Sequence, residues 1–164
     1  MMISSELSMP FITATSDFLT MELGIPATQA PVTESGQQGT SQELNILVGI
    51  TGMINGQVIY SMSAGTAKNI AAVMLGRSVQ PLDRNAQSAL CELGNMITGM
   101  ATSRFDVRYT EVALTPPSLI AGNNIFISVL KMGYIYTSFA TEIGNIDVTI
   151  ATRENTMLKQ ADAV

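Results

Sequence analysis

Residues 88–101 read SALCELGNMITGMA, and their apolar spacing is that of an amphipathic helix. With a rotation of about 100° per residue, Ser88, Glu92, Asn95 and Gly99 fall within one narrow arc. We call these four residues the polar ridge. The opposite arc is wide and apolar, so we expect the helix to pack through that arc and to expose the ridge.

The two glycines of this helix need an explanation, because glycine in a helix interior costs about 1 kcal/mol relative to alanine. Gly94 falls on the apolar arc, together with Met96, and we predict that it allows close packing. Gly99 falls on the ridge, where nothing inside the domain requires a small residue. We expect Gly99 to leave room for a partner. Cys91 and Thr98 are placed at the edges of the ridge.

Composition limits the possible functions. The chain has 164 residues, 46% of them hydrophobic and 13% charged, which predicts a single domain spanning 1–164 with a substantial core. A net charge of −5 and scattered basic residues argue against a nucleic-acid partner. The absence of histidine and the presence of one cysteine exclude histidine-based catalytic triads, histidine metal sites and internal disulfides. With neither a signal peptide nor a membrane span recognisable, we expect a cytoplasmic protein.

The rest of the sequence predicts helices and strands in alternation. The expected helices cover 10–24, a segment that starts after Ser63 or Gly65 and ends at 75, and 83–103, while 155–164 is expected to be a short helix or a frayed terminus. The expected strands cover 44–52, 56–63, 105–114, 124–132, 134–141 and 145–152. Asn55-Gly56 predicts the first hairpin turn. The role of the 33–42 loop stays open.

The first helix contains a weak echo of the ridge. Thr13, Asp17, Thr20 and Gly24 have the same spacing as the four ridge residues. Each helix is followed by an extended, proline-containing segment and then by pairs of strands. This pattern suggests a duplicated unit with a pseudo-twofold axis, although chance could also produce it.

The ridge helix resembles the active-site helix of the CheC/CheX/FliY family of chemotaxis phosphatases, whose motif is (Asp/Ser)-x3-Glu-x2-Asn-x3-Gly. Other segments resemble the same family in the same order: LVGITGMINGQVIYSMS, TAKNIAAVMLG and LTPPSLIAG. The resemblance covers roughly residues 10–150. It implies an α/β (α+β) CheC-like fold, with a mostly antiparallel sheet, long helices packed on one face and the pseudo-twofold duplication.

Within that family the chain resembles the CheX type, which carries one active site. Asp17 and Thr20 occupy the positions where a second site would have Glu and Asn, so we expect these two residues to be structural. The resemblance also implies a homodimer formed by joined sheets, although the sequence does not identify the pairing strand.

The function implied by the resemblance is dephosphorylation of the aspartyl phosphate of a CheY-like receiver. The receiver would supply Mg²⁺ and a lysine, and this chain would bind no metal or cofactor. Asn95 would orient the attacking water, because a carboxamide both donates and accepts hydrogen bonds. Glu92 would pair with the lysine, while Ser88 and Gly99 would contact the partner.

Two alternatives remain open at the level of sequence. The first is a non-catalytic adaptor or flagellar-switch component that binds a receiver through the same fold. The second is an unrelated structural or oligomerisation domain, in which the polar ridge is only a solvated helix face.

Overall fold

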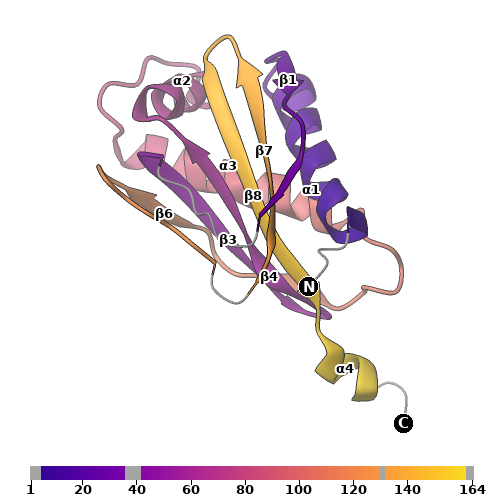
Figure 1. The fold of residues 1–164 in the computed structure, drawn as a ribbon. Coiled ribbons are helices and arrows are strands. Elements are labelled where there is room, and N and C mark those ends of the chain that lie inside the picture. Colours follow the sequence, from indigo (N-terminus) through magenta and orange to yellow (C-terminus); the bar gives the residue numbers. More distant parts are fainter. Residues whose placement is uncertain (1–4, 36–41, 130–131, 162–164) are drawn as a thin grey trace.

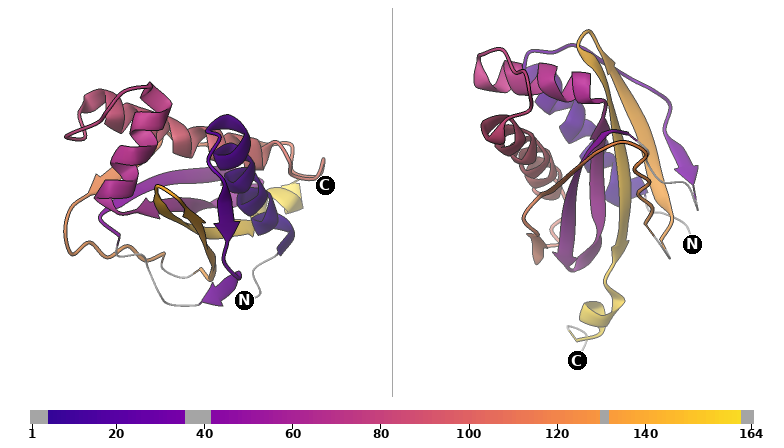
Figure 2. Two further views of the ribbon diagram at one scale, coloured as in Figure 1. Left: turned by 90° about the horizontal axis from the view of Figure 1, so that it is seen from above. Right: turned by 90° about the vertical axis from the view of Figure 1, so that its left-hand side faces the viewer.

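The computed structural model describes residues 5–35, 42–129 and 132–161. An eight-stranded antiparallel sheet carries the helices α1, α2 and α3 on one face (Figures 1 and 2). In chain order the elements are α1 (Ser5–Asp17), the π-helix η1 (Phe18–Glu22), β1 (Ala27–Gln29), β2 (Thr33–Ser35), β3 (Leu44–Gly52), β4 (Ile54–Met62), α2 (Ala64–Leu75), α3 (Arg84–Thr102), β5 (Val112–Leu114), β6 (Ser118–Ala121), β7 (Tyr134–Thr141), β8 (Gly144–Glu154) and α4 (Thr156–Ala161). The expected fold class is confirmed.

The strand order is that of a duplicated unit. Each half supplies a helix, two short strands and a long hairpin, and the strands β4 and β8 of the two hairpins pair antiparallel at the centre. The short strands cross over: β1 and β2 pair with β7 of the second half, and β5 and β6 pair with β3 of the first. Each half therefore places its two short strands on the outer edge of the other half's hairpin, and the two hairpins pair antiparallel. This connectivity is the one that a pseudo-twofold axis between the halves requires.

Local signals position α3 as expected. Asp83 caps the helix by accepting a hydrogen bond from the Ala86 N–H at 2.8 Å, and it forms an ion pair with Arg77 at 2.9 Å. These contacts hold the pKa of the Asp83 carboxyl below its usual value. The preceding helix α2 has one of its two predicted starts, with Ser63 as N-cap, and its predicted end, with Gly76 in the left-handed conformation as C-cap.

The first helix differs from the prediction at its start and in its last turn, whereas Gly24, with φ +65°, follows its end as expected. It begins before Pro10, and Leu7 in this additional turn is buried in the core. A regular helical period from Phe18 would place Met21 on the same buried stripe, but its side chain is 78% exposed. The wider turns of the π-helix Phe18–Glu22 change the angular spacing of side chains, so the helical period used for Met21 no longer holds.

The first hairpin turn lies elsewhere than predicted. The chain turns at Gly52, whose φ is +107°, whereas Asn55 and Gly56 lie inside β4 and pair with β8. A Cβ on Gly56 would collide with the backbone oxygen of Ala151 in β8. The glycine at this position therefore allows two strands to approach closely, and it does not mark the turn.

Two predicted strands are largely absent from the described residues. Of 105–114 only Val112–Leu114 is a strand, because the Asp106 carboxylate accepts the Arg108 N–H and holds the chain in a turn. Of 124–132, the described residues 124–129 contain one isolated bridge, and the prediction for 130–131 lies outside the described residues. A strand forms instead at β6, directly after Pro116 and Pro117. Of the 33–42 loop, 36–41 also lies outside the description.

Candidate functional site

The polar ridge lies on the face of α3 that points away from the sheet. Ser88 and Glu92 are exposed, and Asn95 and Gly99 are partly exposed. The opposite face carries Leu90, Leu93 and Ile97 into the hydrophobic core. Figure 2 shows α3 in the helix layer beside α1 and α2. The helical period therefore predicted the orientation of the ridge.

Within the part of the chain that the structure describes, no hydrogen bond or ion pair engages the side chains of Ser88, Glu92 or Asn95. Glu92 and Asn95 are three residues apart, so they are neighbours on the helix surface. The ridge thus presents a carboxylate and a carboxamide, side by side, to a molecule outside the chain.

The nearby arginines have other partners. Arg104, which follows α3, pairs with Asp17 at 2.8 Å, and Arg108 pairs with Glu6 and Asp106. Among the described residues Glu92 therefore has no internal counter-ion. A carboxylate of this kind can form an ion pair with a cation that a second protein brings.

The two glycines of α3 have the different environments expected from the sequence. A Cβ on Gly94 would lie 2.6 Å from Ile46 Cγ2 and 3.5 Å from Val48 Cγ2, so the helix backbone packs closely against β3. A Cβ on Gly99 would have nothing within 4 Å. The missing side chain of Gly94 serves the core, while that of Gly99 leaves open space on the ridge.

Two residues of α3 differ in burial from what the sequence predicted. Met96 was placed on the apolar arc, yet its side chain is 37% exposed. The signal was present, because Met96 is only about 40° around the helix from Glu92. Thr98 was placed at the edge of the ridge, yet it is fully buried. Its hydroxyl bonds the Gly94 carbonyl and the Tyr60 hydroxyl, and these bonds offset the cost of burying it.

The echo of the ridge in the first helix is used internally. Asp17 forms the ion pair with Arg104, and the Thr20 hydroxyl donates to the Ser16 carbonyl at 2.8 Å. Thr13 makes the same kind of bond to the Met9 carbonyl at 2.6 Å. These contacts agree with the structural role expected for Asp17 and Thr20.

Other kinds of site receive little support. Burial raises the pKa of the Cys91 thiol, which keeps it protonated and weakly nucleophilic near neutral pH. The described residues contain no cluster of three Cys, Asp or Glu side chains that could hold a metal ion. None of the helices described has the length and hydropathy needed to cross a bilayer.

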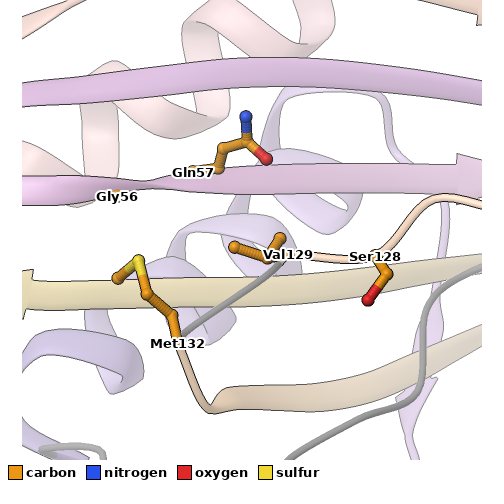
Figure 3. Close-up of a pocket in the computed structure, with 5 residues that line it drawn as sticks. All are labelled: Gly56, Gln57, Ser128, Val129 and Met132. Carbon is orange, nitrogen blue, oxygen red and sulfur yellow. The ribbon is translucent and has the colours of Figure 1, made fainter.

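A pocket of about 320 Å³ lies away from the ridge (Figure 3). It is lined by Gly56 and Gln57 of β4 and by Ser128, Val129 and Met132 of the segment before β7. The described residues that line it carry no charged group, whereas the ridge presents a carboxylate and a carboxamide side by side.

Comparison with known proteins shows which family the sequence is similar to. Residues 44–140, which include α3, match the family model for "Chemotaxis phosphatase CheX". The chain is 39% identical over 107 residues to the CheY-P phosphatase CheX of Thermotoga maritima, an alignment that covers 64% of this chain and 68% of that protein.

Solved structures show the same fold. A chemotaxis protein CheX from Desulfovibrio desulfuricans superposes with a TM-score of 0.81 at 28% identity, covering 90% of this chain and 99% of the other. The CheX of a CheX-CheY-BeF3-Mg²⁺ complex from Borrelia burgdorferi superposes with a TM-score of 0.70 at 24% identity, covering 90% and 98%.

Proposed function

The chain belongs to the chemotaxis phosphatase CheX family, and from this membership we propose that it hydrolyses the aspartyl phosphate of a CheY-like receiver. One observation carries the proposal: Glu92 and Asn95 stand together on the outward face of α3 without internal partners among the described residues. In this proposal one domain, spanning 1–164, acts in the cytoplasm and docks α3 on the active site of the receiver.

Asn95 supplies the catalytic amide in this proposal. Phosphoryl transfer depends mainly on positioning and charge stabilisation, so a helper protein need not form a covalent bond. The carboxamide oxygen of Asn95 can accept a hydrogen bond from a water molecule, and its NH2 group can donate one to the water oxygen or to the phosphoryl group. Asn95 holds that water in line with the phosphorus–oxygen bond that breaks. The attack is then faster, because the water no longer has to reach this geometry by chance. Mg²⁺ stays on the receiver and neutralises phosphoryl charge there.

Glu92 sets the register between the two proteins. Its carboxylate has no counter-ion among the described residues, so an ion pair with a receiver lysine disrupts no contact within this chain. Glu92 and Asn95 share one turn of α3, and fixing the first side chain against the receiver therefore fixes the second. Ser88 and the open space at Gly99 extend the same contact surface along the helix.

Reversing the charge of Glu92 is the first test of this docking mode. Glu92→Lys is expected to raise KM for the phosphorylated receiver by about tenfold or more, because it places two cations together in the interface. The matched control is Glu34→Lys, which makes the same charge change at an exposed position on β2, on the sheet edge formed with β7. Equal KM values for the two variants would contradict the proposed ion pair. The measurement is the receiver decay rate at a series of receiver concentrations.

The function as a whole is tested by the decay of a phosphorylated receiver with and without the wild-type protein. The proposal expects faster release of inorganic phosphate when the protein is present. Binding without acceleration would support the adaptor instead, and absence of binding would support an unrelated domain.

We further propose a homodimer in which the β6 edges of two copies join. Among the described residues β6 pairs only with β3, and the Ile120 side chain on it is 40% exposed. Phe126, which follows in the chain, is 68% exposed. A free edge with apolar side chains favours pairing with another strand.

The dimer is tested by light scattering coupled to size-exclusion chromatography. The wild type is expected at twice the chain mass, and Ile120→Lys at the chain mass, because a charge on the edge opposes pairing. Met21→Lys adds the same charge at an exposed position on η1 and should remain dimeric. A monomeric wild type at micromolar concentration would refute this arrangement.

A further inference from the structure

A pair of buried hydroxyl groups joins α3 to the sheet beneath the polar ridge. Tyr60 on β4 and Thr98 on α3 are both fully buried, and their oxygens lie 2.8 Å apart. Thr98 Oγ1 also lies 2.7 Å from the Gly94 carbonyl, which can only accept a hydrogen bond. The single proton of the Thr98 hydroxyl therefore goes to Gly94, and the Tyr60 hydroxyl donates to Thr98.

The surroundings of this pair are otherwise apolar. Tyr60 belongs to the hydrophobic core, and desolvation raises the pKa of its hydroxyl, so this group remains a donor throughout the physiological pH range. Phenylalanine and valine would fill nearly the same space. A hydrogen bond that replaces one with water in the unfolded chain contributes little net stability. What the Tyr60–Thr98 bond adds, beyond filling space, is a fixed orientation of α3 relative to β4.

The orientation of α3 determines where the Asn95 side chain points. Thr98 is held from below by Tyr60 and is bonded along the helix to Gly94, the residue immediately before Asn95. The pair thus anchors the turn of α3 that carries the amide. Since side chains reach about 5–6 Å from a helix axis, a rotation of roughly 10° would move the Asn95 amide by about 1 Å.

We propose that Tyr60 and Thr98 are positioning residues, which fix the rotation of α3 so that Asn95 is aimed at the phosphoryl site of the receiver. The inference rests on the proposed phosphatase function for its catalytic consequence. It goes beyond that function because neither residue reaches the ridge or the partner.

Variants at the two positions separate positioning from simple stability. Tyr60→Phe and Thr98→Val are each expected to lower kcat about tenfold with KM little changed, because misplacement by 1 Å can cost up to about a hundredfold. The double variant should lose no more than either single one, since both remove the same bond. Thr98→Ser keeps the hydroxyl and should retain the wild-type kcat.

Tyr134→Phe is the matched control, because Tyr134 is also a buried tyrosine but lies on β7, far along the sheet from β3 and α3. It should leave kcat unchanged. If Tyr60→Phe lowered only the melting temperature and left kcat at 25 °C intact, the pair would be structural and the proposal would be overturned.

A readout that needs no activity distinguishes this proposal from the proposed function. The side-chain amide signals of Asn95 are expected to shift or broaden in Tyr60→Phe and to stay unchanged in Tyr134→Phe, as measured by NMR on the isolated protein. Unchanged Asn95 signals in Tyr60→Phe would overturn the positioning role. A wild type without phosphatase activity would overturn the function alone.

Discussion

Replacing Asn95 with alanine is expected to reduce the accelerated decay of the phosphorylated receiver by a factor of about 100 or more, while the affinity for the receiver stays within about twofold. The amide is assigned to the attacking water, which matters in the transition state and adds little to docking. Alanine also has a higher helix propensity than asparagine, so α3 should not unfold. The measurements are a decay assay at saturating protein and a separate binding titration.

Asn85→Ala is the matched control for this variant. Asn85 is an exposed asparagine in the first turn of the same helix, ten residues and so about 15 Å along the axis from Asn95, and its replacement removes the same chemical group at a distance from the proposed catalytic amide. It should decay the receiver at the wild-type rate. Wild-type acceleration in Asn95→Ala would show that the amide does not position the water. A parallel loss of binding would make Asn95 a docking residue.

The ridge was predictable because it depends on one local regularity. A continuous helix from Asp83 to about Ser103 fixes the direction of every side chain, and the sequence contains both the cap and the apolar period. Gly94 and Gly99 could be told apart by the same geometry. No knowledge of the sheet was needed to decide which face was buried.

Thr98 shows where this reasoning stops, whereas the exposure of Met96 could be read from its small angle to Glu92. Thr98 lies near the boundary between the two arcs, where burial depends on what packs against the helix. Thr98 can be buried because the hydroxyl of Tyr60, 38 positions earlier in the sequence, lies within hydrogen-bond distance of its side chain. Neither residue type nor helical angle contains that information.

The errors in the strands have the same origin. Asn55-Gly56 is a strong local signal for a hairpin turn, but Gly56 is used for the close approach of β8, nearly a hundred residues later in the chain. Likewise, the apolar alternation of 105–114 predicted a strand, but the first residues form a turn because the Asp106 carboxylate accepts a hydrogen bond from the Arg108 N–H. Contacts distant in sequence and local side-chain competition overrode the simple period.

The two halves of the molecule have specialised in different ways. The acidic residue of the first helix, Asp17, is neutralised by Arg104 from the end of α3. The corresponding Glu92 of the second helix has no such partner among the described residues. The duplicated scaffold therefore uses one acidic position to join α1 to α3, and it leaves the other available to a second protein.

Leucine substitutions at the two glycines of α3 should have opposite consequences. Gly94→Leu is expected to lower the free energy of unfolding by about 3 kcal/mol, because even a Cβ would lie 2.6 Å from Ile46 Cγ2 and the core must shift. Gly99→Leu should raise it by up to about 1 kcal/mol, since leucine favours helix and meets no neighbour at its Cβ. Urea unfolding of both variants measures the difference.

Phosphatase activity should not follow the stability of the Gly99→Leu variant. A leucine at position 99 fills the open part of the ridge, so the stabilised variant is expected to lose receiver binding and acceleration. Gly99 then exchanges helix stability for access by the partner, as functional sites often do. If Gly99→Leu were both more stable and fully active, this glycine would have no role in docking, and the contact surface would have to lie nearer the Ser88 end of the helix.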